Sequence, residues 1–517
     1  MTSKNKSMYS KLRLILGDQL NIDHSWFKES NENVLYVLME VREETDYTQH
    51  HIQKVTGIFA AMRKFNQMIE GKGFKSTYLK LSDDKNEQSV PANLSALIEE
   101  FDIEEVEYQE PDEYRLDELL KEWSKGIEIP VRKVSTEHFF TSREMVGELF
   151  RNKKAYLMET FYREMRKRTG LLMKGQEPEG GKWNYDPTNR KKLPKDHQPP
   201  PPLLFDHDLS DIVHMIREHG VSTLGNIDPE HYSWPIDREE ALNLLKYFCE
   251  HLLLHFGDFQ DALTSKSWTL YHSRLSFAMN LKLISPKEVC DAVESTFRAS
   301  DEVDITQAEG FIRQILGWRE FMRGIYWAEM PGFAEMNHFE HAAPLPSWYW
   351  NGKTKMACLR QAIQQSLDHG YAHHIQRLMV TGNFALLAGV DPDQVDHWYL
   401  GIYVDAYHWV EVTNTRGMSQ YADGGLVGTK PYVSSASYLH KMGDHCVNCH
   451  YDHKDRTGER SCPLNSLYWH FHDRHRSKLE SNPRISMMYK TWDKMDVQMK
   501  EELLQRGDWV LDHIEEL

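Results

Sequence analysis

The chain has 517 residues, 40% of them hydrophobic, and a formal net charge of −17 at pH 7. Such a chain can bury a large core, and its length favours two or three domains. The negative charge excludes a uniformly basic nucleic-acid binder, because phosphate contacts need Lys and Arg, so only a local patch could bind nucleic acid. No apolar stretch approaches the roughly 18 residues that a membrane span needs, and we expect a soluble protein.

The first 135 residues alternate between apolar runs and amphipathic stretches, which predicts a parallel α/β domain of the Rossmann-like type. Apolar residues recur at helical spacing from Ile52 to Met68 and predict a crossover helix with one buried face. The turn Gly17-Asp18-Gln19 follows the first predicted strand, and ligands of open α/β sheets bind where strands end. The predicted strands are Leu12–Leu16, Val34–Val41, Ser76–Leu81, Glu104–Tyr108 and Val131–Val134.

The segment from Thr136 to about Asp211 is polar, and Gln198 is followed by four prolines that exclude a helix there. We expect a long connector that crosses the surface between the two larger parts of the chain. The predicted domains are therefore residues 1–135, 136–215 and 216–517.

Part of this connector is strongly basic. Residues 151–192 contain 12 Lys or Arg and 5 Asp or Glu. Aromatic residues interrupt the basic ones, as in proteins that contact both the phosphates and the exposed bases of nucleic acids. A solvated surface would show the same charges, so the pattern alone leaves both interpretations open. The aromatic residues are Phe161, Tyr162, Trp183 and Tyr185.

Beyond the connector, apolar residues recur at helical spacing almost without a break. This pattern predicts a helical domain of roughly 300 residues. The predicted helices are Ala241–Phe256, Leu270–Leu283, Pro286–Ala299, Thr306–Ile325, Met356–His369, Ala372–Leu387, Pro392–Tyr407 and Met499–Leu511.

Several polar residues of this helical part are candidates for ligand binding. Ser273 and Ser276 lie in a predicted helix start, where a hydroxyl can cap the helix or hold a phosphate, because the free N–H groups there attract anions. For hydroxyls considered alone, capping is the commoner role. Gln314 and Arg319 could bind a ligand, and they could equally be buried polar residues of the core.

Two adjacent histidines, His373 and His374, point about 100° apart on a helix, so only one of them can face a given pocket. Histidine exchanges protons near neutral pH, and each is a candidate acid or base or a structural residue. Trp350, Trp398 and Tyr399 could pass electrons to a cofactor or belong to an aromatic core.

Four cysteines have the spacing of a metal centre: an isolated Cys358, then Cys446-Val447-Asn448-Cys449, then Cys462-Pro463. Zinc and a 4Fe-4S cluster both accept four cysteines, and the last Cys followed by Pro suits iron-sulfur ligation better. Unrelated buried thiols are the remaining interpretation. Six cysteines in all, and no apolar signal sequence at Met1–Lys11, do not describe a secreted disulfide protein, so we expect a reducing compartment.

Taken together, these motifs resemble the photolyase and cryptochrome family, and the four cysteines are similar to those of its bacterial iron-sulfur branch, the prokaryotic (6-4) photolyases. The resemblance covers essentially the whole chain, and the order of the blocks makes it specific. The blocks that carry it are Leu14–Leu20, Met158–Arg166, Gly180–Asp186, Trp318–Phe321 and Ala372–Met379.

The resemblance implies an N-terminal α/β antenna domain and a large all-helical domain that holds FAD beside a 4Fe-4S cluster. In such enzymes the light-excited reduced flavin passes an electron to a pyrimidine-pyrimidone (6-4) lesion and regains it after repair. The lesion must be flipped out of DNA, because its reacting atoms are shielded inside the duplex. The resemblance further implies a monomer of the bacterial cytoplasm that acts on UV-damaged DNA, with no membrane and no obligate protein partner.

By the same resemblance, Arg377 and Asp405 correspond to an ion pair near the isoalloxazine ring, and Glu411 stands where its nitrogen N5 is approached. A carboxylate there favours a protonated nitrogen. The remaining flavin positions are His272, Ser273, Leu275, Ser276 and Gln314. The positions assigned to the antenna chromophore 6,7-dimethyl-8-ribityllumazine are Gly17, Asp18, Met39 and Glu44.

For repair itself, the resemblance assigns the proton donor to His374, with His373 beside it. Tyr432 and Tyr438 occupy the region in which animal (6-4) enzymes place a second histidine. Trp350, Trp398 and Tyr399 correspond to the path that reduces the flavin, and the basic stretch contacts DNA. Cys358, Cys446, Cys449 and Cys462 correspond to the cluster ligands.

Two other functions compete with repair. A cryptochrome-like photoreceptor would use the same flavin for signalling without turnover of a lesion. An iron-sulfur DNA-binding module without photochemistry would account for the cysteines and the basic stretch but not for the flavin motifs.

Overall fold

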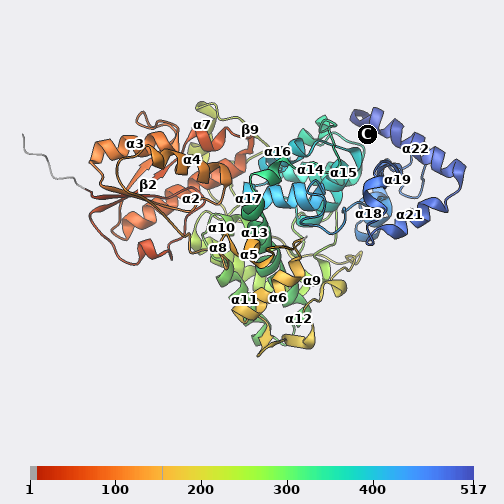
Figure 1. Ribbon diagram of the computed structural model, residues 1–517, viewed down its shortest axis with the longest axis horizontal. Coiled ribbons are helices and arrows are strands. Elements are labelled where there is room, and N and C mark those ends of the chain that lie inside the picture. Colours follow the sequence, from red (N-terminus) through yellow and green to blue (C-terminus); the bar gives the residue numbers. More distant parts are fainter. Residues whose placement is uncertain (1–8, 154) are drawn as a thin grey trace, which may run out of the picture.

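We describe the protein from a computed structural model, which covers residues 9–153 and 155–517. Lys154, one of the basic residues of the connector, lies outside the described residues. The α/β region lies at one end of the molecule and the C-terminal helices at the other (Figure 1). None of the helices in the described ranges is long and apolar enough to cross a membrane.

The α/β region is built on a five-stranded parallel sheet in the order β4-β2-β1-β5-β6. The order reverses at the central strand β1, and such a reversal opens a crevice at the carboxyl ends of the strands. All five predicted strands are confirmed to within two residues at each end. Their bounds are β1 Lys11–Leu14, β2 Val34–Met39, β4 Lys75–Leu79, β5 Glu105–Gln109 and β6 Val131–Val134.

Strand β2 is buried along its whole length, because both faces of the sheet are covered. Leu35 and Val37 face a small core under α3 (Val90–Phe101) and α4 (Tyr114–Lys125). Tyr36 and Leu38 face α2 (Ile52–Gly71), which is the predicted crossover helix. This second core continues without a break into the helical part of the chain.

The expectation that the connector only crosses the surface is wrong for α6 (Met158–Thr169). Met158, Phe161, Tyr162 and Met165 are buried in the main core. They recur at i, i+3, i+4 and i+7, a helical period that the surrounding charges hide in the sequence. Phe161 and Tyr162 are therefore unavailable for stacking on exposed bases.

The chain after the connector is helical, as predicted. Four π-helical segments occur in this part, Phe248–Leu252, Arg313–Arg319, Gln376–Gly382 and Thr413–Ser419, and such segments are frequent at functional sites. The helices that matter for the site are α10 Ser276–Asn280, α12 Ile305–Ile312, α13 Glu320–Glu329, α14 Ala357–His369, α16 Pro392–Ile402, α17 His408–Val412 and α18 Ala436–Met442. The C-terminal end is formed by α19 Pro463–Arg474, α20 Arg476–Leu479, α21 Ser486–Asp493 and α22 Val497–Asp512.

The predicted helix Leu270–Leu283 is wrong over most of its length, because only α10 is helical there. Leu270, Arg274 and Lys282 have positive φ angles of 47°, 56° and 65°, which an α-helix cannot contain. The segment before α10 therefore exposes backbone and side-chain donors that a continuous helix would have used internally.

A buried pair of histidines, His341 in a loop and His475 between α19 and α20, predicts that acid destabilises the fold. His475 Nε2 lies 3.0 Å from His341 Nε2 and accepts a hydrogen bond from Arg474 Nε at 3.1 Å, so it must be unprotonated. Burial lowers the pKa of His341 to about 3 and that of His475 to about 2. The unfolded chain therefore binds more protons below about pH 6.5, and the free energy of unfolding falls as the pH decreases, by up to ~1.4 kcal/mol per pH unit per histidine.

We expect urea unfolding at pH 7, 6 and 5 to show this fall, and His475→Gln to make it shallower. His214→Gln is the control, because the His214 side chain is 78% exposed. An unchanged pH dependence in His475→Gln would contradict the assignment.

Candidate functional site

The residues assigned to the flavin meet around one buried ion pair. Arg377 Nη2 donates to Asp405 Oδ1 at 2.8 Å, and Ser276 Oγ donates to Asp405 Oδ2 at 2.5 Å. Asn280 Nδ2 donates to the backbone oxygen of Asp405 at 2.8 Å. The pair thus joins α10, the π-helical segment Gln376–Gly382 and the loop after α16. The Ser276 hydroxyl bonds a carboxylate rather than capping its helix.

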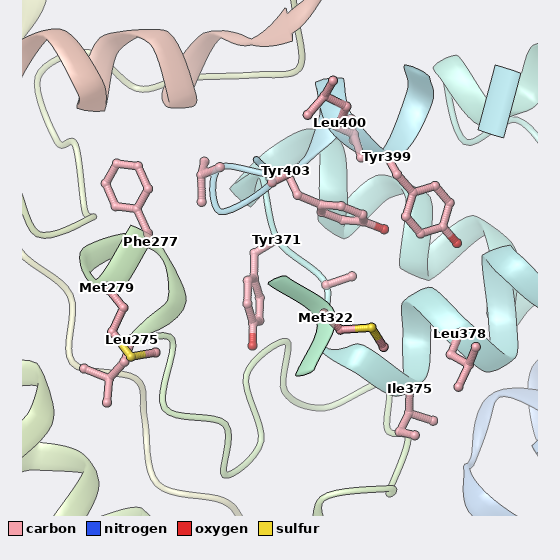
Figure 2. Close-up of a cluster of buried hydrophobic side chains, with 14 of the residues drawn as sticks. Leu275, Phe277, Met279, Met322, Tyr371, Ile375, Leu378, Tyr399, Leu400 and Tyr403 are labelled. Atoms are coloured by element: carbon pink, nitrogen blue, oxygen red, sulfur yellow. The ribbon is translucent and has the colours of Figure 1, made fainter. Parts of the chain in front are cut away.

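Aromatic and aliphatic side chains close the region around this pair. Figure 2 shows Tyr371 between Met279 of α10 and Met322 of α13, with Tyr403 nearby. The guanidinium of Arg377 lies over the Tyr403 ring, 3.8 Å from its centroid. The ion pair is therefore held in surroundings that exclude much of the water, which strengthens its electrostatic effect.

Glu411 is buried on α17 and accepts a hydrogen bond from Thr415 Oγ1 at 2.6 Å. Burial raises the pKa of this carboxyl above its usual value, and the attraction of Arg377 opposes the rise. Glu411 thus holds a proton more readily than an exposed glutamate. A protonated carboxyl can donate a hydrogen bond to a ring nitrogen and a carboxylate can accept one.

The segment before α10 fits a ligand with several acceptor oxygens. The rings of His272 and His373 stack with their centroids 4.6 Å apart. His272 Nε2 and His373 Nδ1 are buried and have no hydrogen-bond partner among the described residues. Together with the hydroxyl of Ser273, they offer polar groups that a bound pyrophosphate would satisfy.

Two other flavin positions lie less directly in this arrangement. Leu275 is fully buried in the core. Gln314 is half-buried and donates to the backbone oxygen of Gly310 at 3.0 Å, within its own helix. The structure therefore shows no bond that joins Gln314 to the Arg377–Asp405 pair.

The two adjacent histidines differ in their surroundings, and the helix begins at His374, so that His373 precedes it. His373 is 2% exposed and its ring stacks on that of His272. Its assigned catalytic role stays a prediction. His374 keeps an exposed surface, while desolvation by the surrounding chain, and then the charge of Arg377, lowers its pKa to about 4.

Tyr432 and Tyr438 are both half-buried and both lie in the field of Arg190, a residue of the basic stretch. Arg190 pairs with Asp186 and approaches Asp261 at 3.8 Å. The structure thus brings the basic stretch to the tyrosines, although more than 240 residues separate Arg190 from Tyr432 in the sequence.

The aromatic residues assigned to electron transfer are only partly in contact. Trp398 and Tyr399 are buried, with ring centroids 5.1 Å apart. Trp350 is 43% exposed, and the ring of its own segment that touches Trp398 is Tyr349, at 5.1 Å. Tyr403 also touches both Trp398 and Tyr399. Sequence reasoning missed Tyr349 and Tyr403, because nothing distinguishes them among 24 tyrosines.

A cavity lies at the carboxyl ends of the strands, where the strand order reverses. Gly17, Asp18, Met39 and Glu44, the four positions assigned to the antenna chromophore, all line it. Its walls are mainly apolar, with a few polar groups among them, which suits a heterocyclic ligand. The helical domain supplies part of the wall through Tyr407, His408 and Trp409.

The cationic partners of Asp18 and Glu44 were not predicted. Lys282, 1% exposed, donates to the backbone oxygen of Asp18 at 2.5 Å and pairs with Asp112 at 2.7 Å. Arg115 pairs with Glu44 at 2.9 Å, and burial raises the pKa of Glu44 to about 7. Lysine and arginine partners from distant elements leave no local signal in the sequence.

The four cysteines assigned to a cluster line a second, small cavity, together with His445 and His453. All six cysteines are free thiols. Burial, and then the neighbouring thiols of Cys449 and Cys446, raise the pKa of Cys358 to about 12. Thiols gathered in this way become thiolates when a cation compensates their charge, so the cavity fits a metal centre. His440 and His453 bring nitrogen ligands within 4.8 Å of Cys446 Sγ.

Most of the basic stretch is at the surface. Lys167, Arg168, Lys182, Lys191 and Lys192 are exposed, and Trp183 lies beneath Arg163 and Lys167. Arg166 is the exception, because it is fully buried and donates to the backbone oxygen of Leu171 at 3.3 Å.

Comparison with known proteins places this geometry in a family. A protein family described as "Deoxyribodipyrimidine photo-lyase-related protein" matches residues 13–232. A (6-4) photolyase of Agrobacterium fabrum is 40% identical over 498 residues, which are 96% of this chain and 97% of that protein.

Solved structures share the fold at low sequence identity. A bacterial class III photolyase from Agrobacterium tumefaciens superposes with a TM-score of 0.54 at 16% identity and covers 83% of each chain. A cryptochrome of Synechocystis sp. PCC6803 gives a TM-score of 0.53 at 12% identity, over 96% of this chain and 93% of that one. Both comparisons confirm an α/β region followed by a largely helical one.

The ion pair at the centre of the site gives a stability prediction. Asp405→Asn leaves the guanidinium of Arg377 buried without a carboxylate, so we expect the free energy of unfolding to fall by about 3–5 kcal/mol. The control is Asp393→Asn: Asp393 is 65% exposed, and its partner Arg416 keeps a second carboxylate in Asp396. The control should cost less than about 1 kcal/mol. If urea unfolding showed the same decrease in the free energy of unfolding for both variants, the Arg377–Asp405 pair would contribute no more stability than an exposed ion pair.

Proposed function

This chain belongs to the photolyase and cryptochrome family, and on that premise we propose that it is a (6-4) photolyase, which uses light to repair pyrimidine-pyrimidone (6-4) photoproducts in DNA. The observation that carries the proposal is the 40% identity to a (6-4) photolyase over nearly the full length of both chains. The gathering of His374, Arg377, Asp405 and Glu411 at one site supports it.

The residues that would hold FAD are those around the Arg377–Asp405 pair. His272 and Ser273 would face its pyrophosphate, and Arg377, Asp405 and Glu411 would face its ring system. When bound and reduced, the flavin supplies the electron that light transfers to the lesion. The chain's own part is to bind and orient it and to keep water from the ring, for which the side chains around Tyr371 and Tyr403 are suited.

His374 is proposed as the proton donor to the lesion. With a pKa of about 4 the ring is neutral at pH 7 and lacks the second, acidic proton of the imidazolium. Binding of anionic groups nearby raises the pKa of a histidine by attraction, and DNA carries phosphates. His374 thus becomes an acid only when a substrate is present. His373 is proposed as a positioning residue, which supports the segment through its stack on His272.

The proposed DNA-binding face consists of the exposed Lys and Arg of residues 151–192 together with Tyr432 and Tyr438. Lysine and arginine position the backbone, while a flipped base needs an apolar or aromatic pocket wall. Tyr432 and Tyr438 supply such a wall beside Arg190. The domains are proposed as an antenna domain at 1–135, a connector at 136–215 and a catalytic domain at 216–517.

Two further cofactors are proposed from the cavities. Cys358, Cys446, Cys449 and Cys462 would hold a 4Fe-4S cluster that ties α14 to the segment after α18. The cavity lined by Gly17, Asp18, Met39 and Glu44 would hold 6,7-dimethyl-8-ribityllumazine, which absorbs light for the flavin. Trp398, Tyr399 and the outer Trp350 are proposed to carry electrons to the flavin.

The repair activity can be tested directly. Reduced, flavin-loaded protein is mixed with an oligonucleotide that carries one (6-4) photoproduct, and restored thymines are measured by chromatography with and without blue light. We expect light-dependent repair in the wild type and a loss of at least 100-fold in His374→Ala, because general acid catalysis contributes about 10²–10⁴-fold. His231→Ala is the control, since the His231 side chain is 65% exposed and lies far from His374 in the sequence.

Two results would count against this assignment. Retained repair in His374→Ala would remove the proposed proton donor. Flavin binding and lesion binding without restored thymines in the wild type would favour a photoreceptor, and protein without flavin would favour an iron-sulfur DNA-binding module.

The cluster has its own test. Cys358→Ser removes the one ligand that comes from α14, so we expect purified protein to lose most of its iron and its broad visible absorbance. Cys249→Ser should keep both, because Cys249 does not line the cavity of the four cysteines. Full iron content in Cys358→Ser would exclude Cys358 as a ligand.

A further inference from the structure

Lys54 is a buried lysine whose role the proposed function leaves unassigned. It lies on α2, in the α/β domain, and is 3% exposed. Its ammonium donates to the backbone oxygens of Leu400 at 3.1 Å and Ala406 at 2.5 Å, and it contacts His50 Nδ1 at 3.2 Å. All three N–H groups of Lys54 therefore have neutral partners. None is left for a ligand in the cavity that the side chain borders.

The positive charge of Lys54 has no carboxylate in contact. Among the described residues, no ion pair within 4.0 Å includes this lysine. The nearest aromatic face is that of Tyr407, 5.5 Å from the nitrogen. Burial of an ammonium is costly, and a fold usually offsets the cost with a direct ion pair. Here the contacts of the ammonium are neutral dipoles, and the carboxyls that attract it lie beyond contact distance.

That field falls on the residues proposed to face the flavin ring. Leu400 and Ala406, whose carbonyls hold Lys54, bracket the turn that carries Asp405. Attraction links Lys54 to Glu411, to Glu113 and to Asp405. None of these carboxyls forms an ion pair with Lys54, and Asp405 is already paired with Arg377. Lys54 is thus a second cation, besides Arg377, that acts on the carboxyls proposed to face the flavin ring.

We propose that Lys54, from the α/β domain, raises the reduction potential of the flavin in the helical domain by stabilising negative charge on the reduced ring. The inference rests on the proposed function only in that the chain binds flavin. Oxidised FAD takes up two electrons and one proton to give its anionic reduced form, and a nearby cation favours the side of this equilibrium with more negative charge. Lys54 is a positioning residue in this sense, because it touches the Asp405 turn and not the substrate.

The test is the two-electron midpoint potential of the bound flavin, measured by spectroelectrochemistry with dithionite as reductant. Lys54→Met removes the charge, and Lys54→Gln removes the charge but keeps N–H groups for the two carbonyls. We expect at least a tenfold loss in stabilisation of the reduced form in both, which is a fall of about 30 mV for a two-electron couple. Lys64→Met is the control, since Lys64 is exposed on the same helix.

The outcomes separate this inference from the proposed function. An unchanged midpoint in a folded, flavin-loaded Lys54→Gln overturns the inference while repair stands. A lower midpoint in both neutral variants but not in Lys64→Met supports it. Wild-type protein that binds no flavin overturns both.

If neither neutral variant keeps flavin, the wild-type midpoint is followed from pH 7.5 to 9.5. Burial lowers the pKa of Lys54 to about 8, whereas burial lowers the pKa of His50 well below its usual value and raises that of Tyr407 well above it. Arg377 stays charged throughout, because attraction to Asp405 outweighs its burial and raises its pKa. Glu411, Glu113 and Asp405 are the carboxyls that attract Lys54. A steeper fall of the midpoint above pH 8 supports the inference, and a single slope overturns it.

Discussion

The Arg377–Asp405 ion pair is the interaction on which the rest of the site depends. It joins three segments that are otherwise separate in sequence, and its carboxylate also receives the Ser276 hydroxyl and anchors Asn280 through its backbone. A buried pair of this kind tolerates little movement, because each partner would be left as an unpaired charge. The aromatic rings packed around the pair, above all Tyr403, restrict its movement further and form a rigid wall of the site. Residues on α10, the segment after α14 and α17 can then act as one surface.

The sequence predicts the fold well and the site unevenly, for physical reasons. Strands of the α/β sheet are buried on both faces, so their apolar runs are unmistakable, and β2 is found with its start at the expected residue. Helix α6 was missed because its apolar stripe is outnumbered by charges, and α10 was overextended because periodicity does not report positive φ angles at Leu270 and Arg274. Local motifs thus predict elements when burial decides the conformation, and fail when the backbone departs from a regular period.

Site residues follow the same division. Resemblance to the family led to His374, Arg377, Asp405 and Glu411, which the structure brings close together, and to four cysteines that line one cavity. It also led to His373, which is buried and stacks on His272. Lys54, Lys282 and Tyr349 had no such guide. Their importance comes from partners that lie far along the chain, from tens to hundreds of residues away, and a single sequence does not record those partners.

Helix α17 is five residues long and contributes residues to two sites, the cavity at the sheet and the proposed flavin site. His408 and Trp409 form part of the wall of the cavity at the sheet, and Glu411, two residues on, belongs to the flavin side. A change in the volume of the side chain at position 409 would therefore shift Glu411, which lies in the same helical turn. Met39 lies on the sheet, where none of the residues assigned to the flavin is adjacent in the chain. An engineer who wished to fit a different pigment into the cavity should reshape the sheet side. Evolution, under the same restriction, would be expected to vary the chromophore by changes at positions such as Met39 and to leave α17 alone.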